Sequence, residues 1–168
     1  LLYINEKNNA NVKIFALVRS LEKARKVFQE DYENPAIKFI LGDVLNLPKI
    51  EEQVDFVIHG ASITASKDFI NRAVETIDIA VNGTLNLLRF ALSKNVQGFV
   101  YLSSMEAFGI TDGKGEVCEK DLGYIDISSP RSSYMESKRM CENLCACFAA
   151  EYGLNVKSVR LTQTFGPG

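Results

Sequence analysis

Runs of apolar and β-branched residues alternate along the chain with longer stretches of helical periodicity. The expected strands are Val12–Val18, Ile37–Leu41, Val54–Ile58, Gly98–Ser103 and Val156–Thr162, and the expected helices are about Leu21–Asp31, Asp68–Lys94 and Ser133–Tyr152. Continuously apolar strands, such as the one through residues 99–102, are typical of a parallel sheet that is covered on both faces. The alternation therefore predicts an α/β fold with a doubly wound, Rossmann-like parallel sheet.

The helix Ser133–Tyr152 has the clearest boundaries. Ser133 and Glu136 fit an S-x-x-E capping box, which predicts that the helix begins there. Apolar residues at every fourth position predict the stripe that packs on the sheet: Met140, Leu144 and Phe148. The segment before it, residues 109–129, is rich in turn-forming residues and predicts a loop. Because this loop follows the carboxyl end of a strand, we expect it to border the ligand crevice.

The composition argues against several classes of partner. A formal net charge of −2 gives no reason to expect a nucleic acid, and the apolar runs are too short to span a membrane. Three of the four cysteines, Cys141, Cys145 and Cys147, lie on one expected helix, a spacing that fits neither a disulfide framework nor a zinc site. Small apolar side chains in a reducing compartment are the simpler interpretation. The single histidine, His59, cannot form a metal site alone, so we expect no metal.

Tyr134 and Lys138 are four residues apart on an expected helix and therefore project from the same face. Tyrosine ordinarily ionises near pH ~10, and a nearby ammonium stabilises its phenolate, so such a pair can exchange a proton at neutral pH. The spacing alone also fits an ordinary surface pair. Ser103 and Ser104 make the pattern more specific, because a serine at a strand end can donate a hydrogen bond to a substrate oxygen beside the tyrosine.

Further motifs accompany this pattern in a fixed order: Gly42–Val44, His59–Ser62, Asn82–Leu88, Ser103–Gly109, Pro130–Arg139 and Val159–Gly168. From about Val12 to Gly168 the chain resembles the extended short-chain dehydrogenase/reductase family, which comprises NAD-dependent nucleotide-sugar epimerases, dehydratases and decarboxylases. Residues 130–145, with the pattern P-R-x-x-Y-x-E-x-K-R-x-x-E-x-x-C, are most similar to the UDP-glucuronate decarboxylases of that family.

The resemblance implies a catalytic set of Ser104, Glu106, Tyr134 and Lys138. In it Ser104 bonds a sugar oxygen, Glu106 assists an oxidation, decarboxylation and reduction sequence, Tyr134 exchanges a proton, and Lys138 holds the nicotinamide ribose and lowers the tyrosine pKa. It implies a nucleotide-sugar substrate that also meets Gln163. The residues expected to bind the cofactor are Arg19, Asp43, Val44, Gly60, Ala61, Ser62, Tyr134 and Lys138. NAD is the expected cofactor. Arg19 can accommodate the 2′-phosphate of NADP or point into solvent.

The chain departs from the family pattern in places. No G-x-x-G-x-x-G loop is present, and residues 1–8 read as the tail of a helix, so we expect residues 1–168 to be a fragment of one NAD(P)-binding domain. In this interpretation an N-terminal piece and a C-terminal substrate domain are missing. Ala80 stands where the family usually has asparagine, and Thr162-Gln163 replaces its F-N pair. Met105 stands where 4,6-dehydratases have an aspartate, which favours decarboxylation or epimerisation over dehydration.

The family resemblance also implies a cytoplasmic homodimer. Two other functions stay open: a carbonyl reductase or dehydrogenase that releases its cofactor, and a non-catalytic dinucleotide-binding module.

Overall fold

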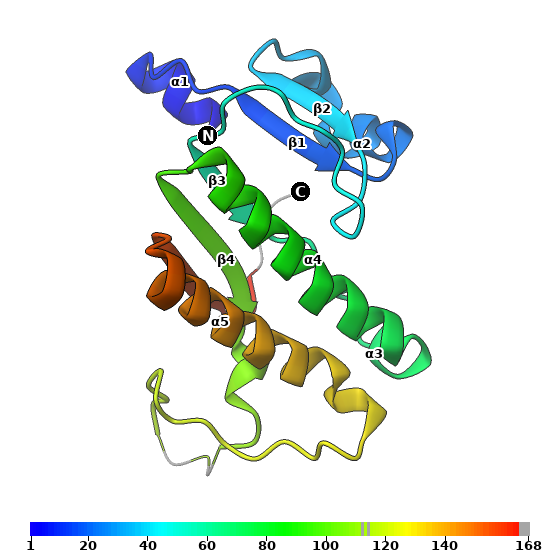
Figure 1. Ribbon diagram of the computed structural model, residues 1–168. Coiled ribbons are helices and arrows are strands. Elements are labelled where there is room, and N and C mark those ends of the chain that lie inside the picture. Colours follow the sequence, from blue (N-terminus) through cyan, green and yellow to red (C-terminus); the bar gives the residue numbers. More distant parts are fainter. Residues whose placement is uncertain (112, 114, 165–168) are drawn as a thin grey trace. The chain divides into compact units, whose positions relative to one another are not determined.

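Strands and helices alternate in the computed structural model, which describes residues 1–111, 113 and 115–164 (Figure 1). In chain order the elements, with η for 3-10 helices, are α1 (Leu2–Asn8), β1 (Ile14–Val18), α2 (Leu21–Phe28), η1 (Gln29–Glu33), β2 (Ile37–Leu41), β3 (Phe56–His59), α3 (Asp68–Asn71), α4 (Ala73–Lys94), β4 (Gly98–Ser104), η2 (Met105–Phe108), η3 (Pro130–Ser132), α5 (Ser133–Tyr152) and β5 (Val156–Leu161). The named strands that pair do so in parallel, which confirms the predicted α/β class. None of the described helices has the length and apolar character needed to cross a membrane.

Local interactions explain where elements differ from the predicted ranges. β1 begins at Ile14 rather than at Val12. The Asn5 side chain forms hydrogen bonds with both the backbone amide and the backbone carbonyl of Val12, so these groups are not available for strand pairing. The long helix predicted over residues 68–94 is interrupted at Arg72, where φ is −133° and ψ is 40°, so that α3 and α4 are separate. The α-helix expected to reach Asp31 ends at Phe28 and continues as η1.

The strands belong to two compact units, Leu1–Ile50 and Glu51–Gly168. In the first unit β1 pairs with β2, and in the second unit the strand order is β3-β4-β5. The sequence predicted one sheet, whereas the described strands form two sheets. Among the described strands, β1 pairs only with β2, and β3 pairs only with β4.

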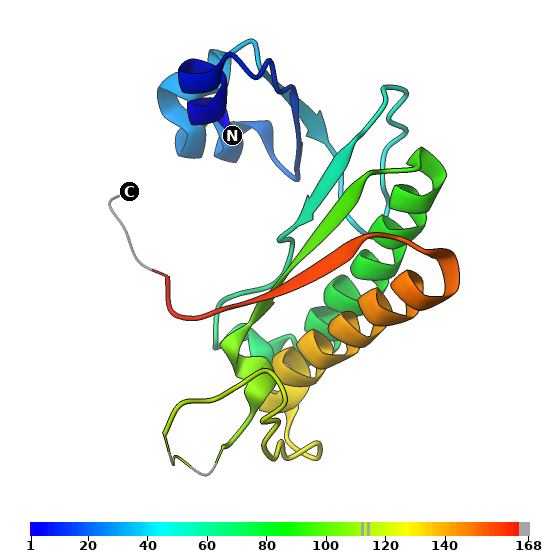
Figure 2. The same cartoon turned by 90° about the vertical axis from the view of Figure 1, so that its left-hand side faces the viewer.

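Helices α4 and α5 lie side by side on one face of the β3-β4-β5 sheet (Figures 1 and 2). Small side chains separate the two helices, and the Cys141 thiol donates to the Ala80 carbonyl at 3.2 Å. The buried core of this unit consists of Ala80, Leu88, Ala91, Val96, Phe99, Tyr101, Cys141, Cys145, Phe148 and Leu154. Cys141 and Cys145 thus pack as small apolar residues, as predicted, while Cys147 is exposed. The apolar contact between helices and sheet is what holds β4 in place.

Two predictions about α5 are wrong. Met140 does not belong to the buried stripe, since it is 50% exposed. Ser133 does not cap the helix, because η3 runs directly into α5 and Ser133 already has helical dihedral angles. Its hydroxyl instead donates to the Phe69 carbonyl on α3 at 2.8 Å. The Ser133 side chain, which the local pattern assigned to a capping box, therefore forms a tertiary hydrogen bond instead.

His59, at the end of β3, is buried with a neutral ring. Its Nε2 lies 2.9 Å from the Thr84 hydroxyl of α4, and its ring lies 5.4 Å from that of Tyr101. Burial, with a smaller contribution from the Lys138 charge, lowers the pKa of His59 to about 4. The unfolded chain takes up a proton on this residue near pH 6.5, whereas the folded chain does so only near pH 4. The folded state is therefore destabilised as the pH falls through this interval.

We expect His59→Leu to reduce the pH dependence of stability in the full-length protein. The wild type should lose roughly 3 kcal/mol of unfolding free energy between pH 7 and pH 4 through His59, and the variant should not. Thr84 keeps a partner in the variant, because its hydroxyl also donates to Cys141. Urea unfolding at several pH values measures the difference. Parallel pH profiles for the two proteins would show that His59 is not the group responsible.

Candidate active site

The carboxyl end of β4 carries the first two predicted catalytic residues. Ser104 ends the strand, and its hydroxyl accepts a hydrogen bond from the Glu106 amide at 3.2 Å, which caps η2. The Glu106 carboxylate accepts from Nη2 of Arg131 at 2.9 Å. β4 is the middle strand of its sheet, but its pairing with β3 ends at Tyr101, so the end at Ser104 pairs with β5 alone, opposite Leu161. The position of Ser104 and Glu106 follows from the strand and from the tight turn that the serine begins.

Tyr134 and Lys138 approach the same strand end from α5. The Tyr134 ring stacks on Phe69 with centroids 4.2 Å apart and an interplanar angle of 9°. The Lys138 ammonium donates to the Leu102 carbonyl of β4 at 2.8 Å and lies 5.4 Å from the Tyr134 ring centroid. Both side chains are at least nine-tenths buried. The structure thus gathers Ser104, Glu106, Tyr134 and Lys138 around the end of β4.

The surroundings of Tyr134 act on its proton in opposite directions. Burial raises the pKa of Tyr134, and the charge of Glu106 raises it further, while the Ser104 hydroxyl and the Arg131 charge lower it. The net effect of these groups is a raised pKa. Burial also lowers the pKa of Lys138. Since the Lys138 ammonium is directed to the Leu102 carbonyl, its predicted stabilisation of the phenolate stays a prediction.

Two residues near Tyr134 were missed by the sequence reasoning. Phe69 stacks on Tyr134 on one side, and the Arg131 guanidinium lies 4.9 Å from the Phe69 ring centroid. Nη1 of Arg131 is buried and has no hydrogen-bond partner among the described residues. Arg131 could have been found from the sequence, because the P-R-x-x-Y pattern places it three residues before Tyr134. No local pattern could reveal Phe69, because it comes from α3, which is distant in sequence.

The predicted cofactor residues are divided between the two units. Gly60, Ala61 and Ser62 directly follow β3, which pairs with β4 through His59 and Tyr101. A Cβ atom at Gly60 would lie 3.2 Å from the Leu102 side chain, so a larger residue at this position would crowd Leu102. Ser62 is half-buried and its hydroxyl donates to the Ile63 carbonyl. These three residues therefore directly follow the strand that lies next to the one that carries Ser104.

Arg19, Asp43 and Val44 belong to the first unit. Arg19 directly follows β1 and is exposed. Asp43 follows the end of β2 and accepts a hydrogen bond from the Leu45 amide at 2.9 Å, while Val44 is buried. All three thus follow the carboxyl ends of parallel strands, where ligands bind in α/β sheets.

The predicted substrate residue Gln163 is exposed and lies just beyond β5. The F-G-P-G ending, residues 165–168, lies outside the described residues.

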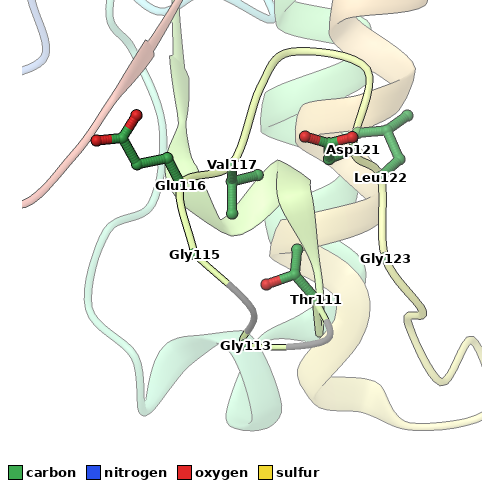
Figure 3. Close-up of a pocket in the computed structure, with 8 residues that line it drawn as sticks. All are labelled: Thr111, Gly113, Gly115, Glu116, Val117, Asp121, Leu122 and Gly123. Atoms are coloured by element: carbon green, nitrogen blue, oxygen red, sulfur yellow. The ribbon is translucent and has the colours of Figure 1, made fainter.

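The predicted loop before η3 encloses a pocket of about 360 Å³ (Figure 3). It is lined by Thr111, Gly113, Gly115, Glu116, Val117, Asp121, Leu122 and Gly123, none of which is a predicted site residue. Arg139 of α5 connects this loop to η2, because it donates to the Gly123 carbonyl of the loop and to the Ala107 and Phe108 carbonyls of η2. Over the described part of the chain, no group of three or more His, Cys, Asp or Glu side chains could hold a metal ion. The chemistry-bearing groups are those at the end of β4.

The opposed charges around Tyr134 lead to a matched pair of predictions for the full-length protein. Arg131→Leu removes a charge that lowers the pKa of Tyr134, so the pKa should rise. Glu106→Gln removes a charge that raises it, so the pKa should fall. A pH titration followed by carbon-13 NMR of labelled tyrosine measures the pKa of Tyr134 in both variants. The Tyr134 signal is assigned by its absence in Tyr134→Phe. Shifts of the same sign in the two variants would contradict this picture of the site.

Known proteins share this arrangement of sequence and fold. The sequence model of the NAD dependent epimerase/dehydratase family matches residues 4–168. A UDP-glucuronic acid decarboxylase 1 from Xenopus tropicalis is 30% identical over 116 residues, which are 68% of this chain and 27% of the relative. A dTDP-glucose 4,6-dehydratase from Streptomyces antibioticus is 28% identical over 138 residues, 80% of this chain and 39% of the relative. The chain thus spans well under half the length of these two curated relatives.

The solved structures include UDP-glucuronic acid 4-epimerase from Bacillus cereus in complex with NAD. It matches with a TM-score of 0.77 and 22% identity, over 98% of this chain and 53% of that one. At this identity the likeness shows the fold, and it confirms the predicted Rossmann-like architecture. Together with the match over residues 4–168, it leads to one conclusion: the chain belongs to the NAD-dependent epimerase/dehydratase family.

Proposed function

We propose that the full-length protein converts a nucleotide sugar by oxidising it transiently and reducing it again, with decarboxylation or epimerisation as the net reaction. The observation that carries the proposal is the gathering of Ser104, Glu106, Tyr134 and Lys138 around the end of β4. A module that only bound a dinucleotide would need no proton-exchanging tyrosine beside a hydrogen-bonding serine. The implied cytoplasmic homodimer is part of the same proposal and rests on the family resemblance.

The surroundings of Lys138 fit a bound dinucleotide. Its ammonium has several N–H donors, yet among the described residues its only hydrogen-bond acceptor is the Leu102 carbonyl. A buried ammonium with unused donors fits the hydroxyls of a ribose. Gly60, Ala61 and Ser62 would line the cofactor beside it, with Asp43 and Val44 at the adenine. NAD is the proposed cofactor, and Arg19 makes NADP the alternative.

The protein's own groups would manage the proton and the oxygen of the sugar. A bound nicotinamide ring supplies the hydride acceptor and donor. Tyr134 would take the hydroxyl proton of the sugar and return it later, while Ser104 would hold the same oxygen by a hydrogen bond. Glu106 would assist the decarboxylation, and Arg131 pairs with its carboxylate at 2.9 Å. The charge of Arg131 also favours the tyrosinate that forms when Tyr134 gives up its proton.

The preference against 4,6-dehydration rests on Met105. This residue follows Ser104 at the position where the resemblance places an aspartate in dehydratases, and it is 40% exposed. A thioether has no proton to give to a departing hydroxyl. The curated relatives include both a decarboxylase and a dehydratase at similar identity, so the preference depends on this residue alone.

An internal cycle of oxidation and reduction restores the cofactor in every turnover, so we expect the full-length protein to keep it bound. Heat-denatured protein should release NAD(H) or NADP(H) in an amount close to that of the polypeptide. An enzymatic cycling assay of the supernatant measures it. An empty site that exchanges freely with added cofactor would instead favour the reductase or dehydrogenase alternative.

Tyr134→Phe removes one oxygen and keeps the ring that stacks on Phe69, so the fold should persist. General acid–base groups contribute about 10²–10⁴-fold, and we expect turnover of a nucleotide sugar to fall by that factor with cofactor still bound. NMR of the products from UDP-glucuronate measures decarboxylation and epimerisation together. Lys138→Ala is the comparison, and it should weaken cofactor retention as well. A near-normal rate in the phenylalanine variant would contradict the catalytic assignment.

A further inference from the structure

Arg160, on β5, is the centre of a contact network that the proposed chemistry does not use. Its Nη2 and Nε donate to the Glu142 carboxylate of α5, at 2.7 Å and 2.9 Å for the shorter contacts. The same carboxylate accepts from the Ser103 hydroxyl of β4 at 2.5 Å. Arg160 and Glu142 side chains are each 17% exposed. One carboxylate thus joins β4, β5 and α5.

Arg160 also reaches two further segments. Its guanidinium lies 4.6 Å from the Phe108 ring centroid in η2. Its Nη1 donates to the Glu119 carbonyl in the loop at 2.8 Å. With Glu142 these contacts connect every segment that carries a predicted catalytic group: the end of β4, the turn η2, and the helix α5.

The neighbours in sequence make this connection specific. Ser103 directly precedes Ser104, and Glu142 lies one helical turn beyond Lys138 on α5. Phe108 is two residues from Glu106. A shift of the Arg160 side chain would therefore be passed to the catalytic groups through bonded or adjacent residues.

Electrostatics keep the network charged. Burial by itself raises the pKa of Glu142, but the hydrogen bonds from Arg160 and Ser103, with the charges of Arg160 and Lys138, outweigh it, so the pKa of Glu142 is lowered. Partly buried ion pairs often add little to net stability, because removing the charges from water offsets their attraction. The role of the pair of Arg160 and Glu142 therefore follows from the segments that it connects, and not from its contribution to stability.

We propose that Arg160 is a positioning residue which, through Glu142 and Ser103, sets the distance of Ser104 on β4 from Tyr134 and Lys138 on α5. The inference rests on the proposed function and deepens it, since Arg160 touches no reacting atom. Its planar fork is what allows two parallel hydrogen bonds to one carboxylate, which an ammonium cannot make.

The test uses three variants of the full-length protein: Arg160→Met, Arg160→Lys and Glu142→Gln. Lys26→Met is the matched control, because Lys26 forms an exposed ion pair with Glu22 in the first unit. Each variant is assayed for kcat and KM, bound dinucleotide, and thermal unfolding. Misplacing a reacting group by about 1 Å can cost ~10²-fold, so we expect kcat to fall by about 10- to 100-fold in Arg160→Met. Cofactor content and KM should stay close to wild type.

Arg160→Lys should lie between the wild type and Arg160→Met, because it keeps the charge and loses the fork. The control should have wild-type kcat. If Arg160→Met does not fold, Arg160→Lys and Glu142→Gln carry the test. A wild-type kcat per folded, cofactor-loaded molecule in these variants would overturn the proposal and leave a structural role only.

A second readout does not require a substrate. Displacing Ser104 removes a hydroxyl that lowers the pKa of Tyr134, so this pKa should rise in both Arg160→Met and Glu142→Gln. A direct effect of the altered charges would instead act in opposite directions in the two variants. Opposite shifts, or none, would overturn the proposal even if no nucleotide sugar is turned over. If Tyr134→Phe loses activity while Arg160→Met keeps wild-type activity, this inference is rejected and the proposed function stands.

Discussion

The hydrogen bond from the Lys138 ammonium to the Leu102 carbonyl joins α5 to β4, and the candidate site depends on that junction. It places a cation near the carboxyl end of β4. Because residues 102–104 of β4 pair with β5, this end of β4 cannot move without disturbing β5. Tyr134 is fixed on the same helix and stacked on Phe69. A rigid strand end and a rigid helix thus meet where the proposed proton transfer occurs.

This rigidity is accompanied by a balance of charge. Burial makes ionisation of Tyr134 more costly, and the Glu106 carboxylate adds to that cost, while Arg131 and the Ser104 hydroxyl reduce it. Arg131 and Glu106 also neutralise one another at 2.9 Å. Arg131 and Glu106 therefore act on Tyr134 as an opposed pair, and a bound ligand with its own charge would shift the balance. Arg160 and Glu142 form a second ion pair, between β5 and α5.

The sequence predicted the elements well where periodicity and strand character were strong. α5 occupies the predicted residues, and the five strands lie within two residues of their predicted starts. Two predictions about α5 failed because local periodicity and spacing do not report tertiary contacts. Ser133 matched a capping box but bonds the Phe69 carbonyl, and Met140 matched the buried stripe but faces solvent. For Ser133, the tertiary hydrogen bond outweighed a capping preference of about 1 kcal/mol.

By itself the sequence determined the fold class, the family and the four residues that gather at the end of β4, because those depend on residue order, on spacing along a helix and on strand ends. It could not identify Phe69 or the roles of Arg131, Glu142 and Arg160, which interact across elements. Only the tertiary structure decided these contacts. Their geometry depends on how α3, α5 and β5 pack around β4, and side chains distant in sequence leave no periodic signal.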